Sequence, residues 1–248
     1  MKQPCLIVLP LFFAVISGVA QQASPAHQLS RINRFIDFAG AIGNSQGTAA
    51  ASFVYNWRLG KTRKWELGVG ARWTSYFGNR SNFTTAPARL ARSTTIPFII
   101  VFAGQETQNW DTLTVKSPFV NSVNSTVNIG YNFNTKWSAG FNIDLAGFSF
   151  GRRGNGVLTS NGVAANEPNA KPAAFNVLLT GDNDLGSLNS EFFLKYKPGN
   201  RWAVKAVYGF YFAEYKTSTV KQIAPDGTIV DRFRNKVNSL GLGLSWHF

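Results

Sequence analysis

The chain has 248 residues and a formal net charge of +13, from 25 Lys and Arg against 12 Asp and Glu. It has two His, and its one Cys is Cys5. No cysteine follows Cys5, so the rest of the chain cannot contain a disulfide framework, a thiolate metal site or a cysteine nucleophile.

The N-terminus is typical of an export signal. Lys2 precedes an apolar run over residues 5–19, and small residues lead up to Ala20. Residues 1–20 are therefore predicted to be a cleaved secretory signal peptide. The polar residues 21–33 are expected to form a periplasmic lead, and residues 34–248 a single domain. For an exported chain without a nucleic-acid motif, the basic surplus favours phosphorylated lipid head groups over nucleic acid as partners.

Runs in which apolar and polar residues alternate recur along the domain, and this period of two indicates strands with one apolar and one polar face. In the run 65–76, Leu67 and Val69 fall on one face, whereas Glu66 and Arg72 fall on the other. The predicted strands are, in chain order, 34–43, 48–57, 65–76, 122–133, 137–150, 186–197, 201–215 and 237–248.

The connections between these runs alternate in length. Short connections at one end (58–64, 134–136, 198–200) contrast with long insertions at the other (77–121, 151–185, 216–233). This rhythm predicts an all-β fold, a single antiparallel transmembrane β-barrel of about eight strands with short periplasmic turns and long outer loops.

The first long insertion leaves alternatives open. Residues 95–103 and 112–116 are expected to be strands that extend a hairpin above the membrane, and a further membrane hairpin here would change the strand count. The apolar run 96–102 could instead fold over the barrel mouth, because Pro97 argues against a central strand.

The last strand carries the most specific pattern. Its apolar face ends at the chain terminus and consists of Leu240, Leu242, Leu244, Trp246 and Phe248. This resembles the closing strand of small bacterial outer-membrane β-barrel proteins of the OmpA/OmpX type, which commonly end on Phe. The expected location is the cell outer membrane, where we expect a monomer with outer-membrane lipids and lipopolysaccharide as partners, the latter through basic groups on the outer loops. The resemblance also implies that the barrel-assembly machinery reads an assembly signal in Leu242, Leu244, Trp246 and Phe248.

The polar faces of the predicted strands supply charges to the barrel interior. Strand order and height suggest that Glu191 pairs with Lys205 and that Arg72 meets Asp144 across the lumen. An interior of this size is either filled by side chains or holds one small ligand, so a polar plug and a narrow or gated pore are both open. The expected lumen charge cluster is Asp37, Glu66, Arg72, Asp144, Glu191, Lys195 and Lys205.

No catalytic, cofactor or metal site is expected. In the barrels that this chain resembles, members that modify lipids use a His near the outer rim. Here His27 lies in the lead and His247 at the periplasmic end of the last strand. Asp182 and Asp184 form a doublet without calcium-loop spacing. We therefore expect a non-enzymatic barrel with a structural or surface-interaction role through its outer loops. A narrow channel for small solutes or hydrophobic molecules is the alternative, followed by a lipid-modifying enzyme.

Overall fold

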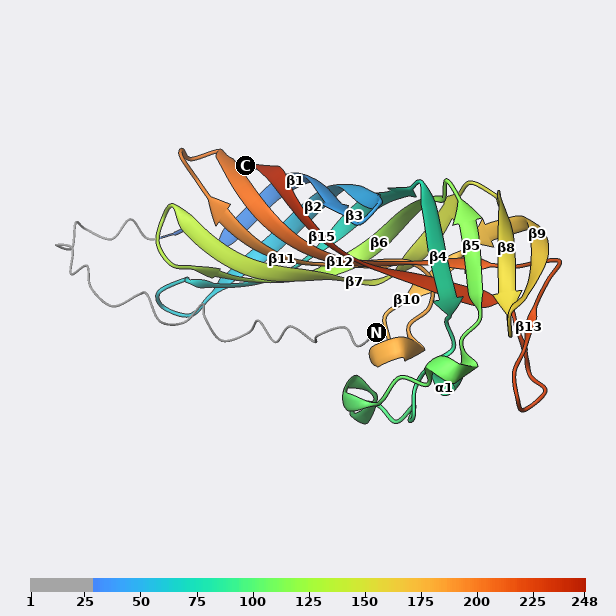
Figure 1. The fold of residues 1–248 in the computed structure, drawn as a ribbon. Helices are drawn as coiled ribbons and strands as arrows, with labels where there is room; N and C mark the ends of the chain where they lie inside the picture. Colours follow the sequence, from blue (N-terminus) through green and yellow to red (C-terminus); the bar gives the residue numbers. More distant parts are fainter. Residues whose placement is uncertain (1–28) are drawn as a thin grey trace.

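The computed structural model describes residues 29–248 (Figure 1). The expected signal peptide and most of the expected lead lie outside the described residues. Within them, no helix is long and apolar enough to cross a membrane. The long strands are β1 (Ile32–Gly43), β2 (Gln46–Leu59), β3 (Trp65–Gly78), β6 (Phe119–Asn132), β7 (Trp137–Gly151), β11 (Leu188–Tyr196), β12 (Trp202–Lys216) and β15 (Arg232–His247).

These long strands form a closed antiparallel ring, which we call the main barrel. Each pairs with the next in the order β1, β2, β3, β6, β7, β11, β12 and β15, and β15 pairs back with β1. The closing pair runs from Phe35 opposite His247 to Ile42 opposite Leu240. Closure leaves no free edge, so the backbone polar groups of the wall are satisfied within it.

The outer insertions continue the same sheet. They contain β4 (Arg80–Thr85), β5 (Thr112–Lys116), β8 (Gly154–Ser160), β9 (Val163–Pro172) and β10 (Phe175–Val177). β4 pairs with the outer end of β15, β9 pairs with the outer end of β12, and β5 and β8 link them. A second, smaller ring results, the outer ring, which shares β12 and β15 with the main barrel. Its strands β4, β5 and β8 run steeply across the direction of the main barrel (Figure 1).

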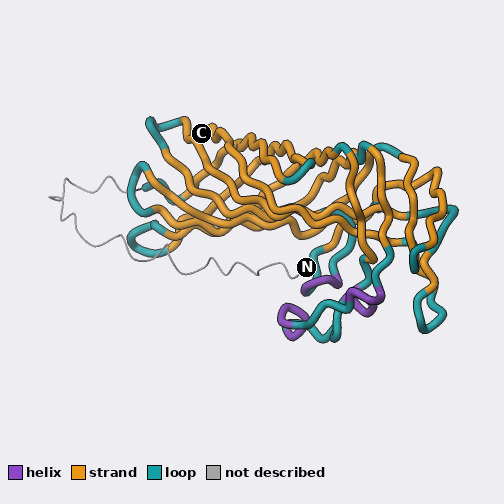
Figure 2. Tube along the Cα trace, in the orientation of Figure 1, coloured by secondary structure: helices purple, strands orange, loops and turns teal. Residues whose placement is uncertain are grey.

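The expected count of about eight strands therefore does not describe this sheet, which has thirteen. The difference arises because the insertions at 79–118 and 152–187 pair with one another and with the long strands. Short turns gather at one end of the main barrel, whereas the insertions gather at the other (Figure 2). The remaining elements are α1 (Ala88–Ala91), the 3-10 helices η1 (Ile99–Phe102), η2 (Thr107–Asn109) and η3 (Gly181–Asn183), and the hairpin β13 (Gln222–Ile223) and β14 (Ile229–Val230).

The main barrel is apolar outside and polar inside. Phe38 is 59% exposed, whereas its neighbour Asp37 is 2% exposed. In β3, Val69 and Trp73 are exposed while Arg72 is buried. A water-soluble sheet turns its apolar face to a core, so this inversion is typical of a wall that meets lipid.

A bulge in β7 preserves the inversion along its outer half. Ser125 and Thr126 of β6 face Ala146 and Asp144, so Leu145 is an extra residue. The extra residue shifts the alternation by one position. As a result Asp144 points inward while Phe148 remains exposed on the outside.

One local expectation was wrong. Residues 95–103 form no strand, and η1 occupies part of this segment instead. Leu188 and Phe212 lie opposite each other on the outward face of β11 and β12, and both are buried. Arg234 places its guanidinium 4.7 Å from the Phe212 ring.

Replacing Val69 by Arg tests the lipid-facing assignment. If Val69 faces the middle of the bilayer, the substitution costs about 2–4 kcal/mol of folding free energy in lipid vesicles. Ile229, which is also largely exposed but lies in the short outer hairpin, is the matched control. There the same change is expected to cost under about 0.5 kcal/mol. Equal costs in a denaturant titration would contradict the assignment.

Candidate functional site

Six charged side chains cross the middle of the main barrel in an alternating chain. Lys195 and Lys205 donate to Asp37 at 3.2 and 3.0 Å. Lys205 also lies 3.4 Å from Glu191. On the other side of Glu191, Arg72 Nη1 lies 3.4 Å away. The chain ends where Arg72 Nη2 lies 2.6 Å from Asp144.

This charge chain is neutral and fully desolvated. It contains three cations and three carboxylates, and each side chain is at most 6% exposed. Because a buried charge is costly unless it is paired and hydrogen-bonded, the alternation is what allows these groups to fill the lumen. The pairs that strand order suggested, Glu191 with Lys205 and Arg72 with Asp144, are both part of it.

Amide groups complete the hydrogen bonding at the Asp144 end. Asn124 donates its side-chain N–H to Asp144 Oδ2 at 2.7 Å, and the Asn189 backbone N–H donates to the same oxygen at 2.9 Å. Asn142 accepts from Arg72 through its side-chain oxygen. The Arg72–Asp144 pair is therefore held in one orientation by three neighbouring strands.

A glycine makes room for one of the lysines. A Cβ on Gly243 of β15 would lie 2.8 Å from Cε of Lys205 on the neighbouring strand β12. The inward glycine thus lets the Lys205 side chain lie flat along the wall. At this position the space left by glycine is occupied by a side chain rather than by water.

Glu66 lies apart from the charge chain, at the periplasmic end. It accepts hydrogen bonds from Asn33, Asn56 and Asn132 at 2.9–3.2 Å and from Arg58 at 2.8 Å. This cluster closes the periplasmic mouth. Beside it, His247 Nδ1 lies 2.8 Å from Asn33 Oδ1.

An aromatic and apolar core, which the sequence interpretation missed, closes the outer end. Tyr76 stacks on Tyr211 with ring centroids 5.4 Å apart, and Phe83 packs edge-on against Tyr215 at 5.0 Å. The outer ring encloses the rest of this core. The alternation in β5 was the available signal, but β5 pairs with β4 of its own insertion and with β8 of the next insertion, which the alternation does not show. The core also contains Leu113, Val115, Leu158, Ala170 and Phe233, all buried.

Outside the wall, the outer ends of β12 and β15 carry a second charged cluster. Arg232 pairs with Glu214 at 2.7 Å, and Arg234 lies 3.3 Å from the same carboxylate. Asp182 of η3 pairs with Arg92 and Lys236. These ion pairs fasten the loop that carries η3 to the barrel.

Asp184 follows η3 and is less favourably placed. Burial raises the pKa of its carboxyl to about 6, and the nearby negative charge of Asp182 acts in the same direction. Its Oδ1 accepts a hydrogen bond from the Leu179 backbone N–H at 2.6 Å. This pKa is well above that of an exposed aspartate, so the Asp184 carboxyl is expected to change charge near pH 6.

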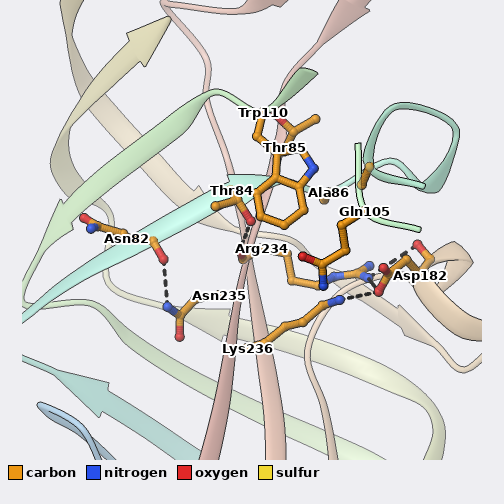
Figure 3. Close-up of a pocket in the computed structure, with 11 residues that line it drawn as sticks. Asn82, Thr84, Thr85, Ala86, Gln105, Trp110, Asp182, Arg234, Asn235 and Lys236 are labelled. Atoms are coloured by element: carbon orange, nitrogen blue, oxygen red, sulfur yellow. Dashed lines mark hydrogen bonds and ion pairs between the residues drawn. The ribbon is translucent and has the colours of Figure 1, made fainter. Parts of the chain in front are cut away.

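A pocket of about 260 Å³ lies between β4, the outer end of β15 and the loops of the first insertion (Figure 3). Trp110 forms one wall, with Thr84 beside it, and Gln105, Asp182 and Arg234 lie at the opposite side. Trp110 Nε1 and Arg234 Nε are buried and have no hydrogen-bond partner among the described residues. The pocket therefore combines an aromatic wall with polar and charged side chains.

The remaining predicted residues lie where the strands place them. Leu242, Leu244 and Phe248 are exposed on the outside. Trp246 is packed edge-on against Trp202, with ring centroids 4.4 Å apart. Among residues 29–248 no group of three His, Cys, Asp or Glu side chains is arranged to hold a metal ion.

The closed pairing and the inverted distribution of side chains define an outer-membrane β-barrel. No protein-family model and no curated protein matches the chain. Among solved structures, it is similar to Ail of Yersinia pestis, with a TM-score of 0.37 and 11% identity over 89% of this chain and 100% of that one. It is also similar to Neisserial surface protein A, with a TM-score of 0.34 and 9% identity over 88% of this chain and 96% of that one.

A weaker similarity extends to the toluene transporter TodX of Pseudomonas putida, with a TM-score of 0.24 and 9% identity over 89% of this chain and 80% of that one. The assignment of this chain to the outer-membrane class rests on its own strand pairing and side-chain distribution.

Replacing Lys205 by Met is expected to cost about 3–5 kcal/mol, because it leaves the buried charge chain with one unbalanced carboxylate. Adding Glu191→Gln to Lys205→Met leaves two neutral pairs, Lys195 with Asp37 and Arg72 with Asp144. The double variant is therefore expected to be more stable than Lys205→Met alone in a urea titration in vesicles.

Lys136→Met, on an exposed periplasmic turn, is the control for loss of a lysine and is expected to change stability by under about 0.5 kcal/mol. If the stability loss of the double variant equals the sum of the losses from Lys205→Met and Glu191→Gln, the two charges do not interact. That result would contradict the alternating charge chain.

Proposed function

We propose that the eight strands of the main barrel span the outer membrane and that the protein is a non-conducting barrel, which acts through its outer surface. The observation that carries this proposal is the filling of the lumen at three levels. The Glu66 cluster, the charge chain and the aromatic core follow one another from the periplasmic to the outer end. An interior of this width has no room for a water path once such side chains fill it.

The outer surface offers charge to phosphorylated lipids. Arg80, Arg89, Arg152 and Arg153 are exposed on the insertions. Guanidinium groups form paired, charge-assisted hydrogen bonds with phosphate. We expect lipopolysaccharide to bind here, with the protein as a monomer whose terminal strand is recognised by the barrel-assembly machinery.

Conductance of the refolded chain in a planar bilayer tests the sealed lumen. The expected result is no current above that of the lipid, with insertion verified by protease protection of the strands. Steady openings that disappear in Arg72→Leu would contradict the proposal and favour the alternative, a narrow channel lined by the charge chain.

The pocket beside Trp110 is the place on the outer surface where a small polar molecule fits. The indole provides an apolar face, while Asp182, Gln105 and Arg234 provide polar groups on the other side. Such sites hold ligands through apolar contact and orient them through a few polar groups. A hydroxylated ring the size of one sugar has both kinds of surface.

Saturation-transfer NMR with methyl glucoside tests this pocket. We expect transfer to the sugar protons with the refolded chain and its loss in Trp110→Ala. Trp73→Ala, which removes an exposed indole from the lipid-facing wall, is the matched control and should retain the transfer. Equal signals in the two variants would show that the pocket is not the site.

A further inference from the structure

Residues 93–104 of the first insertion form a long run without a charged residue, although the chain has a net charge of +13. Large apolar side chains on this segment point away from the protein. Phe98 is 79% exposed and Phe102 is 89% exposed, and Ile96 and Ile99 are also mostly exposed. We call Ile96–Phe102 the apolar loop.

The apolar loop is held in place by its neighbours. Ile100 of this loop is buried, with 1% of its surface exposed. It packs against Gly181 of η3, where a Cβ would lie 2.6 Å from Ile100 Cγ2. Asn183 donates its side-chain N–H to the Thr95 carbonyl at 3.3 Å. Phe98 has a φ of +67°, a conformation that bulky residues rarely adopt, so the exposed ring is held at a strained position.

The segment that holds the apolar loop emerges from the wall of the barrel, of which β10 is a part. β10 pairs with β7, with Phe175 opposite Phe148 and Val177 opposite Ala146. The next residue, Leu178, donates its backbone N–H to the Leu145 carbonyl at 2.6 Å. η3 follows directly, and the apolar loop packs on η3. The loop therefore sits beside the wall rather than over the barrel mouth, as Figure 1 also shows.

This position joins the apolar loop to the lipid-facing surface. Phe148 and Leu145 are exposed on the outside of β7, and Phe175 of β10 is 77% exposed next to them. Apolar surface thus continues from the wall through β10 to the apolar loop. Exposed apolar patches of this kind mark an interaction surface, and here the surface that the wall already meets is lipid.

We propose that the apolar loop is a membrane anchor, which inserts Phe98, Ile99 and Phe102 into the outer leaflet beside the barrel. This proposal depends on the proposed function, in which the main barrel spans the membrane. Exposed aromatic and aliphatic side chains partition into the boundary between head groups and acyl chains, with charged groups staying at the head-group level. The anchor fixes the loops around the Trp110 pocket at the membrane surface. The pocket would therefore bind its ligand close to the lipid head groups.

Site-directed fluorescence tests the anchor. Cys5 is the only cysteine, so in a full-length Cys5→Ser background a cysteine at Phe98 or Phe102 can carry a single environment-sensitive probe. The protein is refolded into phosphatidylcholine vesicles that contain lipids with a nitroxide at a shallow or a deep acyl position. Val69→Cys on the wall and Ile229→Cys on the outer hairpin are the matched controls.

The expected result is blue-shifted emission at Phe98 and Phe102, with stronger quenching by the shallow nitroxide than by the deep one. The probe at Val69 should be quenched most by the deep nitroxide, and the probe at Ile229 by neither. Emission and quenching at Phe98 equal to those at Ile229 would overturn the anchor while leaving the barrel in the membrane.

Two other outcomes would also overturn the anchor. A blue shift at Phe98 that depends on the protein-to-lipid ratio, without quenching by either lipid, would mean that a second copy covers the apolar loop. Loss of quenching at Val69 as well would mean that the main barrel does not span the bilayer, so the failure would lie with the proposed function.

Discussion

Closure of the main barrel by the pairing of β15 with β1 is the constraint on which the rest of the structure depends. Lipid offers no hydrogen bonds to a backbone, so a sheet can span it only as a ring without edges. Once the ring is closed, each strand has one face toward lipid and one toward a narrow interior. The outward face must be apolar, and the inward face must satisfy every polar group that it carries.

The charge chain is the solution to the second requirement. Six charged groups from five strands alternate in sign. The absence of a side chain at Gly243 leaves space for Lys205, and asparagine amides provide further hydrogen bonds. Two strands of the main barrel also build the structure above it. β12 and β15 extend beyond their neighbours β11 and β1, and their outer ends carry the outer ring. The outer surface is therefore presented by strands that are themselves part of the main barrel.

The local part of this structure could be predicted from the sequence. Period-two alternation identifies which residues share a face, and so Asp37, Arg72 and Asp144 could be assigned to the interior before any contact was known. Strand order then brings Glu191 and Lys205 together. The alternation does not show which insertions pair, because β5 pairs across to β8 of the next insertion as well as with β4 of its own. For the same reason, the buried state of Leu188 on an outward face could not be foreseen.

The apolar loop illustrates a different limit. Its Ile, Val and Phe residues favour a strand, but the segment does not alternate and includes Pro97, so it has no face to pair. Its conformation is set by Ile100 against Gly181 and by contacts with η3, more than eighty residues later in the chain. What the sequence does show is the absence of charge, and that feature acquires a meaning only when the loop is found beside the lipid-facing wall.

Reactivity of a cysteine placed inside the lumen tests the sealed barrel most directly. Thr74 points into the main barrel just above the charge chain and is fully buried, whereas Thr228 lies near the tip of the outer hairpin. In a Cys5→Ser background refolded into vesicles, a small water-soluble thiol reagent is expected to label Thr228→Cys quickly and to leave Thr74→Cys unlabelled until the protein is unfolded. Labelling of both cysteines at similar rates in the folded protein would mean that water passes through the lumen, and the barrel would then be open.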